Sequence, residues 1–245
     1  MLVERREGLK TLTLDSPATS NSLTHATVED LLRAVRESCS DGTETLVFTA
    51  LGPNFCSGFD LDHLEDARDG DLFLRFVRIE LLLQAVYMAP FDTVTCAKGA
   101  TYGAGADLFA ACRWRLADPG ARFLMPGLQF GVALGTRRFA ALVGETAAYE
   151  LLAAGAPFNL AAARGAGLVT QVAREEEWQA LVRERHTSRL VRGEPLSRLS
   201  QLTRQDMCAQ DMRSLVESAG EPGLVERIRR YRAKVQERRK AQTGK

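Results

Sequence analysis

Two glycine-containing turns have the residue types and spacing to bind a negative charge that develops during a reaction. They occupy residues 54–61 and 98–108, and each follows a short apolar segment. Small residues matter there because a ligand can approach bare backbone only where no side chain intervenes. If each turn directs one N–H group at the same point, the pair forms an oxyanion hole that stabilises charge on a carbonyl oxygen. The alternative is that both segments are ordinary turns between a strand and a helix.

Three other chemical signatures are missing from the sequence. Leu108 occupies the third glycine position of a G-x-G-x-x-G fingerprint, so a dinucleotide site is not supported. Phe55 and Phe59 stand where a G-x-S-x-G elbow has its glycines, which argues against Ser57 as a covalent nucleophile. The five cysteines form no C-x-x-C pair and the three histidines are scattered. The sequence therefore predicts neither a disulfide framework nor a metal site.

Length and composition indicate a globular protein with a sizeable core, since 45% of the 245 residues are hydrophobic and 26% are charged. The net charge of +1 gives no overall field to attract nucleic acid or an anionic membrane. Residues 226–245 carry nine Lys and Arg against two Glu, or +7, which leaves −6 for the remainder. No membrane span is predicted, because the longest stretch without an ionic residue, 45–59, contains Gly-Pro-Asn. The charged N-terminus has no apolar run behind it, so we expect a cytoplasmic protein.

Short apolar strands alternate with helical patterns along the first half of the chain. Residues 9–14 alternate as a strand does, whereas residues 28–35 place apolar side chains at helical spacing. Such alternation predicts an α/β fold with a mainly parallel sheet. The predicted elements are a hairpin over 2–14, helices from 24 and over 71–88, strands over 45–50, 93–97 and 113–117, a glycine-rich turn over 99–105 with a helix to 112, helices over 136–143, 145–154, 160–163 and 175–190, and helices over 197–240 broken at 220–223.

Several short motifs follow one another in a characteristic order. They are Leu14-Asp15-x-Pro17-x-x-x-Asn21-Ser22-Leu23, Phe55-Cys56-Ser57-Gly58-x-Asp60-Leu61, Gly99-x-x-x-Gly103-x-Gly105-x-Asp107-Leu108, Ala117-Asp118, Phe123-x-x-Pro126 with Gly131, Gly135-Thr136-x-Arg138, and Ala162-Ala163-x-x-x-Gly167-Leu168-Val169. In this order and spacing the chain resembles the crotonase (enoyl-CoA hydratase/isomerase) superfamily over about residues 9–173.

The resemblance implies a crotonase-like β-β-α spiral with a helical C-terminal region. We divide the chain into an acyl-CoA-binding core over 1–190 and a helical segment with a basic tail over 191–245. Members of the superfamily bind acyl-CoA thioesters, with CoA as part of the substrate and no further cofactor, and assemble as homotrimers or dimers of trimers. By position in the motifs, the two oxyanion N–H groups belong to Phe59 and Ala104. The residues expected to hold CoA, mainly through backbone contacts, are Ala18, Ser57, Asp60, Leu61 and Asp62.

Two positions depart from the pattern of the superfamily's hydratases, which carry a glutamate at each. Asp107 keeps a carboxylate at the first but is one methylene shorter, and Gly127 leaves nothing at the second. The segment 131–135 is also a few residues shorter than the usual glycine-rich loop. We predict Asp107 as the single acid/base group, the alternative being a carboxylate that only stabilises its helix N-terminus. Polar candidates for a second group, none with a spacing argument, are Tyr102, His63, Glu80 and Glu145.

The leading hypothesis is an enzyme of hydratase/isomerase type that stabilises an enolate at the two amides and moves protons through Asp107. The alternatives are a catalytically silent acyl-CoA-binding protein and a divergent thioester hydrolase or decarboxylase. The basic C-terminal run either neutralises the CoA phosphates or, as we favour, forms the solvated face of a terminal helix. Its central cations are Arg227, Arg229, Arg230, Arg232 and Lys234.

Overall fold

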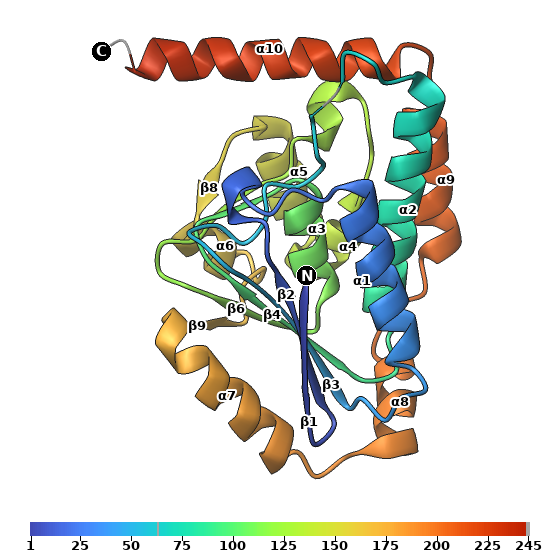
Figure 1. The fold of residues 1–245 in the computed structure, drawn as a ribbon, viewed down its shortest axis with the longest axis vertical. Helices are drawn as coiled ribbons and strands as arrows, with labels where there is room; N and C mark the ends of the chain where they lie inside the picture. The colour runs from blue at the N-terminus through green and yellow to red at the C-terminus, as the bar shows by residue number, and fades with distance from the viewer. Residues whose placement is uncertain (63, 244–245) are drawn as a thin grey trace.

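A six-stranded sheet forms the centre of the computed structural model, which describes residues 1–62 and 64–243 (Figure 1). Its strand order is β1-β2-β3-β4-β6-β9, and every neighbouring pair is parallel except the β1–β2 hairpin. The predicted α/β class with a mainly parallel sheet is confirmed. The strands of this sheet are β1 (Leu2–Arg6), β2 (Leu9–Leu14), β3 (Thr45–Ala50), β4 (Asp92–Ala97), β6 (Trp114–Ala117) and β9 (Gln171–Val172).

Helices cover the sheet and make up most of the second half of the chain (Figure 1). They are α1 (His25–Glu37), α2 (Asp69–Tyr87), α3 (Ala104–Ala111), α4 (Thr136–Val143), α5 (Glu145–Ala154), α6 (Leu160–Gly165), α7 (Glu175–Ser188), α8 (Gly193–Leu202), α9 (Cys208–Ala219) and α10 (Leu224–Thr243), with short 3-10 turns η1 (Pro17–Thr19) and η2 (Gly127–Phe130). Among these helices, none combines the length and the apolar character needed to cross a membrane.

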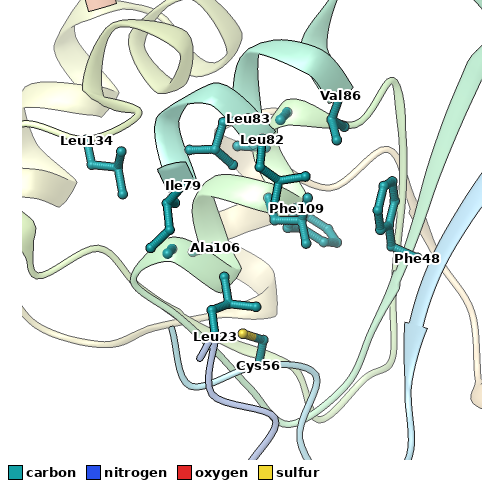
Figure 2. Packing of buried hydrophobic residues seen from close by; sticks show 14 of the residues in the cluster. Leu23, Phe48, Cys56, Ile79, Leu82, Leu83, Val86, Ala106, Phe109 and Leu134 are labelled. Atoms are coloured by element: carbon teal, nitrogen blue, oxygen red, sulfur yellow. The ribbon is translucent and has the colours of Figure 1, made fainter. Parts of the chain in front are cut away.

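The alternation of side chains along the buried strands divides the core in two. In β3, Leu46 and Phe48 face the main cluster while Val47 faces a second, smaller one, as the two-residue period of a strand requires. The main cluster lies between the sheet and helices α1, α2 and α3, where Figure 2 shows Phe48 and Phe109 together. Helix α7 covers the other face. A parallel sheet covered on both faces gives the continuous apolar strands that the sequence shows.

The local sequence fixes where the first long helix begins and which face it buries. Thr24 is the N-cap of α1, and its side chain accepts a hydrogen bond from the Thr27 N–H at 3.1 Å. The residues predicted for the inner face are all buried, namely Val28, Leu31, Leu32 and Val35. Helix α1 packs against α2.

A second, three-stranded sheet was not predicted. Its order is β5-β7-β8, with bounds Ala100–Tyr102, Arg122–Leu124 and Phe158–Asn159. The predicted turn over residues 99–105 is wrong in part, because residues 100–102 form a strand before α3 begins. Strands of two or three residues are too short to show a periodic pattern, so only the pairing with distant partners defines them.

The helical C-terminal segment lies against α2 and across one end of the molecule. Helix α9 packs beside α2, where the Gln84 side chain donates to the Cys208 carbonyl at 2.9 Å. Helix α10 runs along the top in Figure 1 and contacts both α2 and η2. The domain division at residue 190 remains a prediction.

Candidate active site

A cavity of about 780 Å³ opens between the first turn of α3, the turn after β3 and helix α10. Its inner wall is largely apolar and includes Phe76, Met125 and Leu134. The structure brings all the predicted site residues to this one cavity, although their roles remain predictions. They are Ala18, Ser57, Phe59, Asp60, Leu61, Asp62, Ala104 and Asp107.

The two glycine-containing turns meet with their backbones in contact. A Cβ atom placed on Gly58 would lie 2.6 Å from the Tyr102 carbonyl oxygen and 3.1 Å from the Ala104 nitrogen. Gly58 also has a φ of +91°, which favours glycine over any residue with a side chain. A Cβ on Gly103 would in turn lie 3.7 Å from the Gly58 Cα. Glycine at 58 therefore allows the two chain segments to come close enough for both to face one ligand atom.

Two N–H groups at this junction are left without a protein acceptor. The Gly58 carbonyl accepts from the Leu23 N–H at 2.8 Å, and the Asp60 N–H donates to the Leu23 carbonyl at 3.4 Å. Between them, the Phe59 N–H donates to no group in the described part of the chain. The same holds for Ala104, the first residue of α3, whose N–H is an unpaired donor by the geometry of a helix start. Both residues line the cavity, so its wall carries two unpaired N–H donors among the described residues.

Asp107 lies one turn into α3 with its carboxyl group buried at the cavity wall. The residue is 5% exposed, and its Oδ1 atom has no hydrogen-bond partner among the described residues. Gly135 packs directly on this carboxyl, since a Cβ there would lie 2.0 Å from Oδ1. Burial raises the pKa of the Asp107 carboxyl well above its usual range; Arg138 opposes the shift and Glu80 adds to it. A carboxyl with a raised pKa at a cavity wall is a candidate for proton transfer.

Behind Asp107, a buried ion cluster joins three helices. Arg138 of α4 donates to both carboxylate oxygens of Glu80 on α2, at 2.8 and 2.6 Å. It also donates to Asp211 of α9 at 2.7 Å, and each of these three residues is at most 6% exposed. Both Glu80 oxygens are thus held by Arg138, and Glu80 does not line the cavity. Glu80 is therefore not free to act as a second acid.

The other proposed substitutes for the second acid are distributed differently. Tyr102 lines the cavity beside the oxyanion turn, whereas Glu145 is exposed and lies outside the cavity lining. His63 lies outside the described residues. The sequence singles out Arg138 within a motif and Glu80 as a candidate acid, but it indicates neither Asp211 nor the pairing among the three. A pairing between helices far apart in the chain leaves no spacing signal.

The position of the missing glutamate is closed by backbone. A Cβ on Gly127 would lie 2.6 Å from the Val132 carbonyl oxygen, and the Val132 N–H donates to the Gly127 carbonyl at 2.9 Å. The short 131–135 segment therefore folds back onto η2 and fills the space that a side chain at 127 would need. The structure gives a physical reason for glycine at this position.

The basic tail is more than a solvated face, which corrects the interpretation favoured from the sequence. Arg227 donates to the carbonyl groups of Phe130, Gly131, Ser218 and Glu221, all within 3.2 Å. Arg229 donates to the Leu64 and Glu65 carbonyls. Arg232 lines the cavity and donates to the Leu61 carbonyl at 3.2 Å. These arginines hold the segments that border the cavity, while Arg230 pairs with Glu226 at the surface.

Comparisons with known proteins agree with this geometry. The family model described as enoyl-CoA hydratase/isomerase matches residues 4–226. A probable enoyl-CoA hydratase of Mycobacterium tuberculosis is 28% identical over 185 residues, covering 74% of each chain. An enoyl-CoA isomerase/hydratase of Mycosarcoma maydis is 26% identical, covering 68% of this chain and 65% of the other.

Solved structures extend the likeness to almost the whole chain. A candidate enoyl-CoA hydratase/isomerase from Bordetella parapertussis is 40% identical and superposes with a TM-score of 0.90, covering 95% of this chain and 98% of the other. An enoyl-CoA hydratase from Bacillus halodurans shares the fold at a TM-score of 0.81 and 21% identity, with coverage of 93% and 98%. The crotonase-like architecture predicted from the motifs is confirmed, and the chain belongs to the enoyl-CoA hydratase/isomerase (crotonase) family.

Proposed function

We propose that the protein binds an unsaturated acyl-CoA and moves its double bond by transferring one proton through Asp107. The observation that carries this proposal is the convergence of two unpaired N–H groups and one buried carboxyl on the same cavity. The N–H groups of Phe59 and Ala104 would both donate to the thioester carbonyl oxygen, which would lie between them. Donors fixed in a largely apolar cavity stabilise an enolate oxygen better than water does, because they need no reorganisation.

The proposed step needs only one carboxyl group. The Asp107 carboxylate removes a proton from the α-carbon of a 3-enoyl thioester, and the electron pair moves onto the carbonyl oxygen as a dienolate. Collapse of the dienolate returns the same proton from Asp107 to the γ-carbon, and the double bond then lies between the α- and β-carbons. Atoms and charge balance without a co-reactant. Hydration would require a second group to position water, and Gly127 with the Val132 carbonyl leaves no space for one.

The test separates the candidate reactions by their products. We would incubate the protein with hex-3-enoyl-CoA and with crotonyl-CoA, following absorbance and product mass. Isomerisation creates a conjugated thioester of unchanged mass, hydration adds one water, and thioester hydrolysis releases free CoA. Asp107→Asn is expected to lower isomerisation at least about 100-fold, in line with the loss of an acid/base group. Asp30→Asn, which removes an exposed carboxylate on α1 that pairs with Arg33, serves as the control.

The outcomes decide between the hypotheses directly. Hydration as the main reaction, or an Asp107→Asn variant with unchanged kinetics, would overturn the proposal. Binding of acyl-CoA with neither product nor exchange of the α-protons in D₂O would favour the silent binding protein instead.

We propose further that Ala18, Ser57 and the backbone of residues 60–62 hold the CoA moiety at the cavity mouth, as the family resemblance implies. Assembly as a homotrimer or a dimer of trimers and a cytoplasmic location are part of the same proposal. Light scattering of the purified chain tests the assembly; a monomer at micromolar concentration would contradict it.

A further inference from the structure

Arg75 on α2 makes an unusual set of contacts with the turn that carries the first oxyanion amide. Its guanidinium carbon lies 4.2 Å from the centre of the Phe59 ring. The same guanidinium donates to the Asp60 carbonyl at 3.0 Å and lies 3.7 Å from the Asp60 carboxylate. One side chain therefore contacts both the residue with the free N–H and the residue after it.

The Phe59 ring is held by a second neighbour from the same helix. Phe76 stacks on it with the ring centres 4.4 Å apart and the planes 14° from parallel. Phe59 thus has its side chain packed against two consecutive residues of α2, Arg75 and Phe76. Because α2 is a 19-residue helix with seven buried positions, it is a rigid support for a turn that has little regular structure of its own.

The backbone on either side of the Phe59 N–H is also fixed. The Leu23 backbone bonds to the Gly58 carbonyl and to the Asp60 N–H. Arg75 fixes the next carbonyl, that of Asp60. The Phe59 N–H lies between these hydrogen-bonded backbone groups. Its direction therefore depends on the hydrogen bonds of Gly58 and Asp60.

We infer that Arg75 is a positioning residue that aims the Phe59 amide at the thioester oxygen. Arg75 is not among the residues lining the cavity, so it acts through Phe59 and Asp60 rather than on the substrate. The planar guanidinium suits this role, because it can lie over an aromatic ring while its N–H groups donate in the plane. The inference rests on the proposed function, since it assumes that the Phe59 amide polarises a thioester carbonyl.

The experiment reads the polarisation of the carbonyl without relying on turnover. Cinnamoyl-CoA is a conjugated thioester whose absorption band moves to longer wavelength when donors polarise its carbonyl oxygen. We expect the band to shift on binding to the wild-type chain. Arg75→Met should lower that shift by at least half and lower kcat for isomerisation about 10- to 100-fold, because small misplacements in an active site have effects of this size. KM and the affinity for cinnamoyl-CoA should change less than about threefold.

Two further variants keep the test independent of folding. Arg75→Lys keeps the charge but cannot cover the ring and donate to Asp60 together, so an intermediate shift is expected. Arg78 lies one turn further along the same helix, pairs with Glu29 of α1 and does not line the cavity. The control variant Arg78→Met should therefore behave as wild type. Thermal unfolding of each variant identifies any that fail to fold.

The outcomes separate this inference from the proposed function. If wild type shifts the band and a folded Arg75→Met or Arg75→Lys variant shifts it equally, the role of Arg75 is wrong while the oxyanion hole stands. If wild type binds cinnamoyl-CoA without any shift, or does not bind it, both the inference and the proposed function are overturned.

Discussion

Restoring an acid at position 127 is a direct test of how this site is built. We expect Gly127→Glu to gain no hydratase activity, because backbone already occupies the space its side chain needs. A Cβ at 127 would lie 2.6 Å from the Val132 carbonyl oxygen, 0.8 Å inside the 3.4 Å at which ordinary contact begins. The Val132 N–H also donates to the Gly127 carbonyl at 2.9 Å, so the two residues cannot separate without weakening that bond.

The magnitude of the effect follows from these two contacts. Overpacking of this kind costs about 1–3 kcal/mol, and a weakened backbone hydrogen bond adds about 0.5–1.5 kcal/mol. In a chain of this length each kcal/mol lowers Tm by about 2–4 °C, so Gly127→Glu should lose at least about 3 °C. Gly127→Ala carries the same Cβ and should lose a similar amount without adding an acid.

A matched control comes from Gly70 on α2, where an added Cβ meets nothing within 4 Å. Gly70→Ala should be neutral or stabilise the helix by about 0.5–1 kcal/mol. Calorimetry gives the Tm values, and the mass of the product from crotonyl-CoA reports hydration. A Gly127→Glu variant that melts with wild type and hydrates crotonyl-CoA would show that the 131–135 segment yields easily, and would refute this explanation of the missing acid.

Three further predictions concern the buried charges. Asp107→Asn should raise the free energy of unfolding, because burial raises the pKa of the wild-type carboxyl and so disfavours its charged form. The contribution of the protonated carboxyl to wild-type stability is complete below about pH 4. It falls as the pH rises toward the folded pKa. Urea unfolding should therefore show the variant's advantage growing as the pH rises above about pH 4, and a constant difference would contradict this. Isomerisation by wild type should rise with pH through the same raised pKa, since proton removal needs the carboxylate, and a rate that falls over this range would assign the base to another group. Arg138→Leu should cost about 3–5 kcal/mol, because Glu80 stays buried without its guanidinium partner and Asp211 is left with the half-exposed Arg137. The exposed-pair control Arg198→Leu should cost less than about 1 kcal/mol, and equal losses would refute the difference.

The sequence was sufficient to predict the parallel sheet, and the family resemblance named eight residues that lie together at the cavity. The inner strands β3 and β4 are buried along their length, and α1 buries the stripe that its spacing indicated. The two turns were recognisable because Gly58 and Gly103 sit at fixed places in motifs. The contact between the two turns belongs to the tertiary structure. A family resemblance can imply it, and the fold shows its geometry.

Other features depend on neighbours that lie far apart in the chain. Glu80 and Asp211 are separated from Arg138 by 58 and 73 residues, so nothing in their spacing marks them as partners. The arginines of α10 were predicted as surface charge, because whether a cation meets water or a carbonyl group depends on the loops beside it. Arg75 is not singled out by any motif of the sequence, and its position over the Phe59 ring is visible only in the fold.

The absent second acid and the short 131–135 segment are best understood as one structural change. The segment touches the vacated position through Val132 and the remaining acid through Gly135, whose Cβ would lie 2.0 Å from the Asp107 Oδ1. It therefore fills the space of a second acid and keeps the first one desolvated, which is the main cause of the raised Asp107 pKa. A carboxyl in such a place exchanges a proton more readily with a bound carbon acid than with bulk water. If the proposed isomerisation is right, the segment that leaves no space for a second acid also desolvates the carboxyl that returns the proton to the substrate.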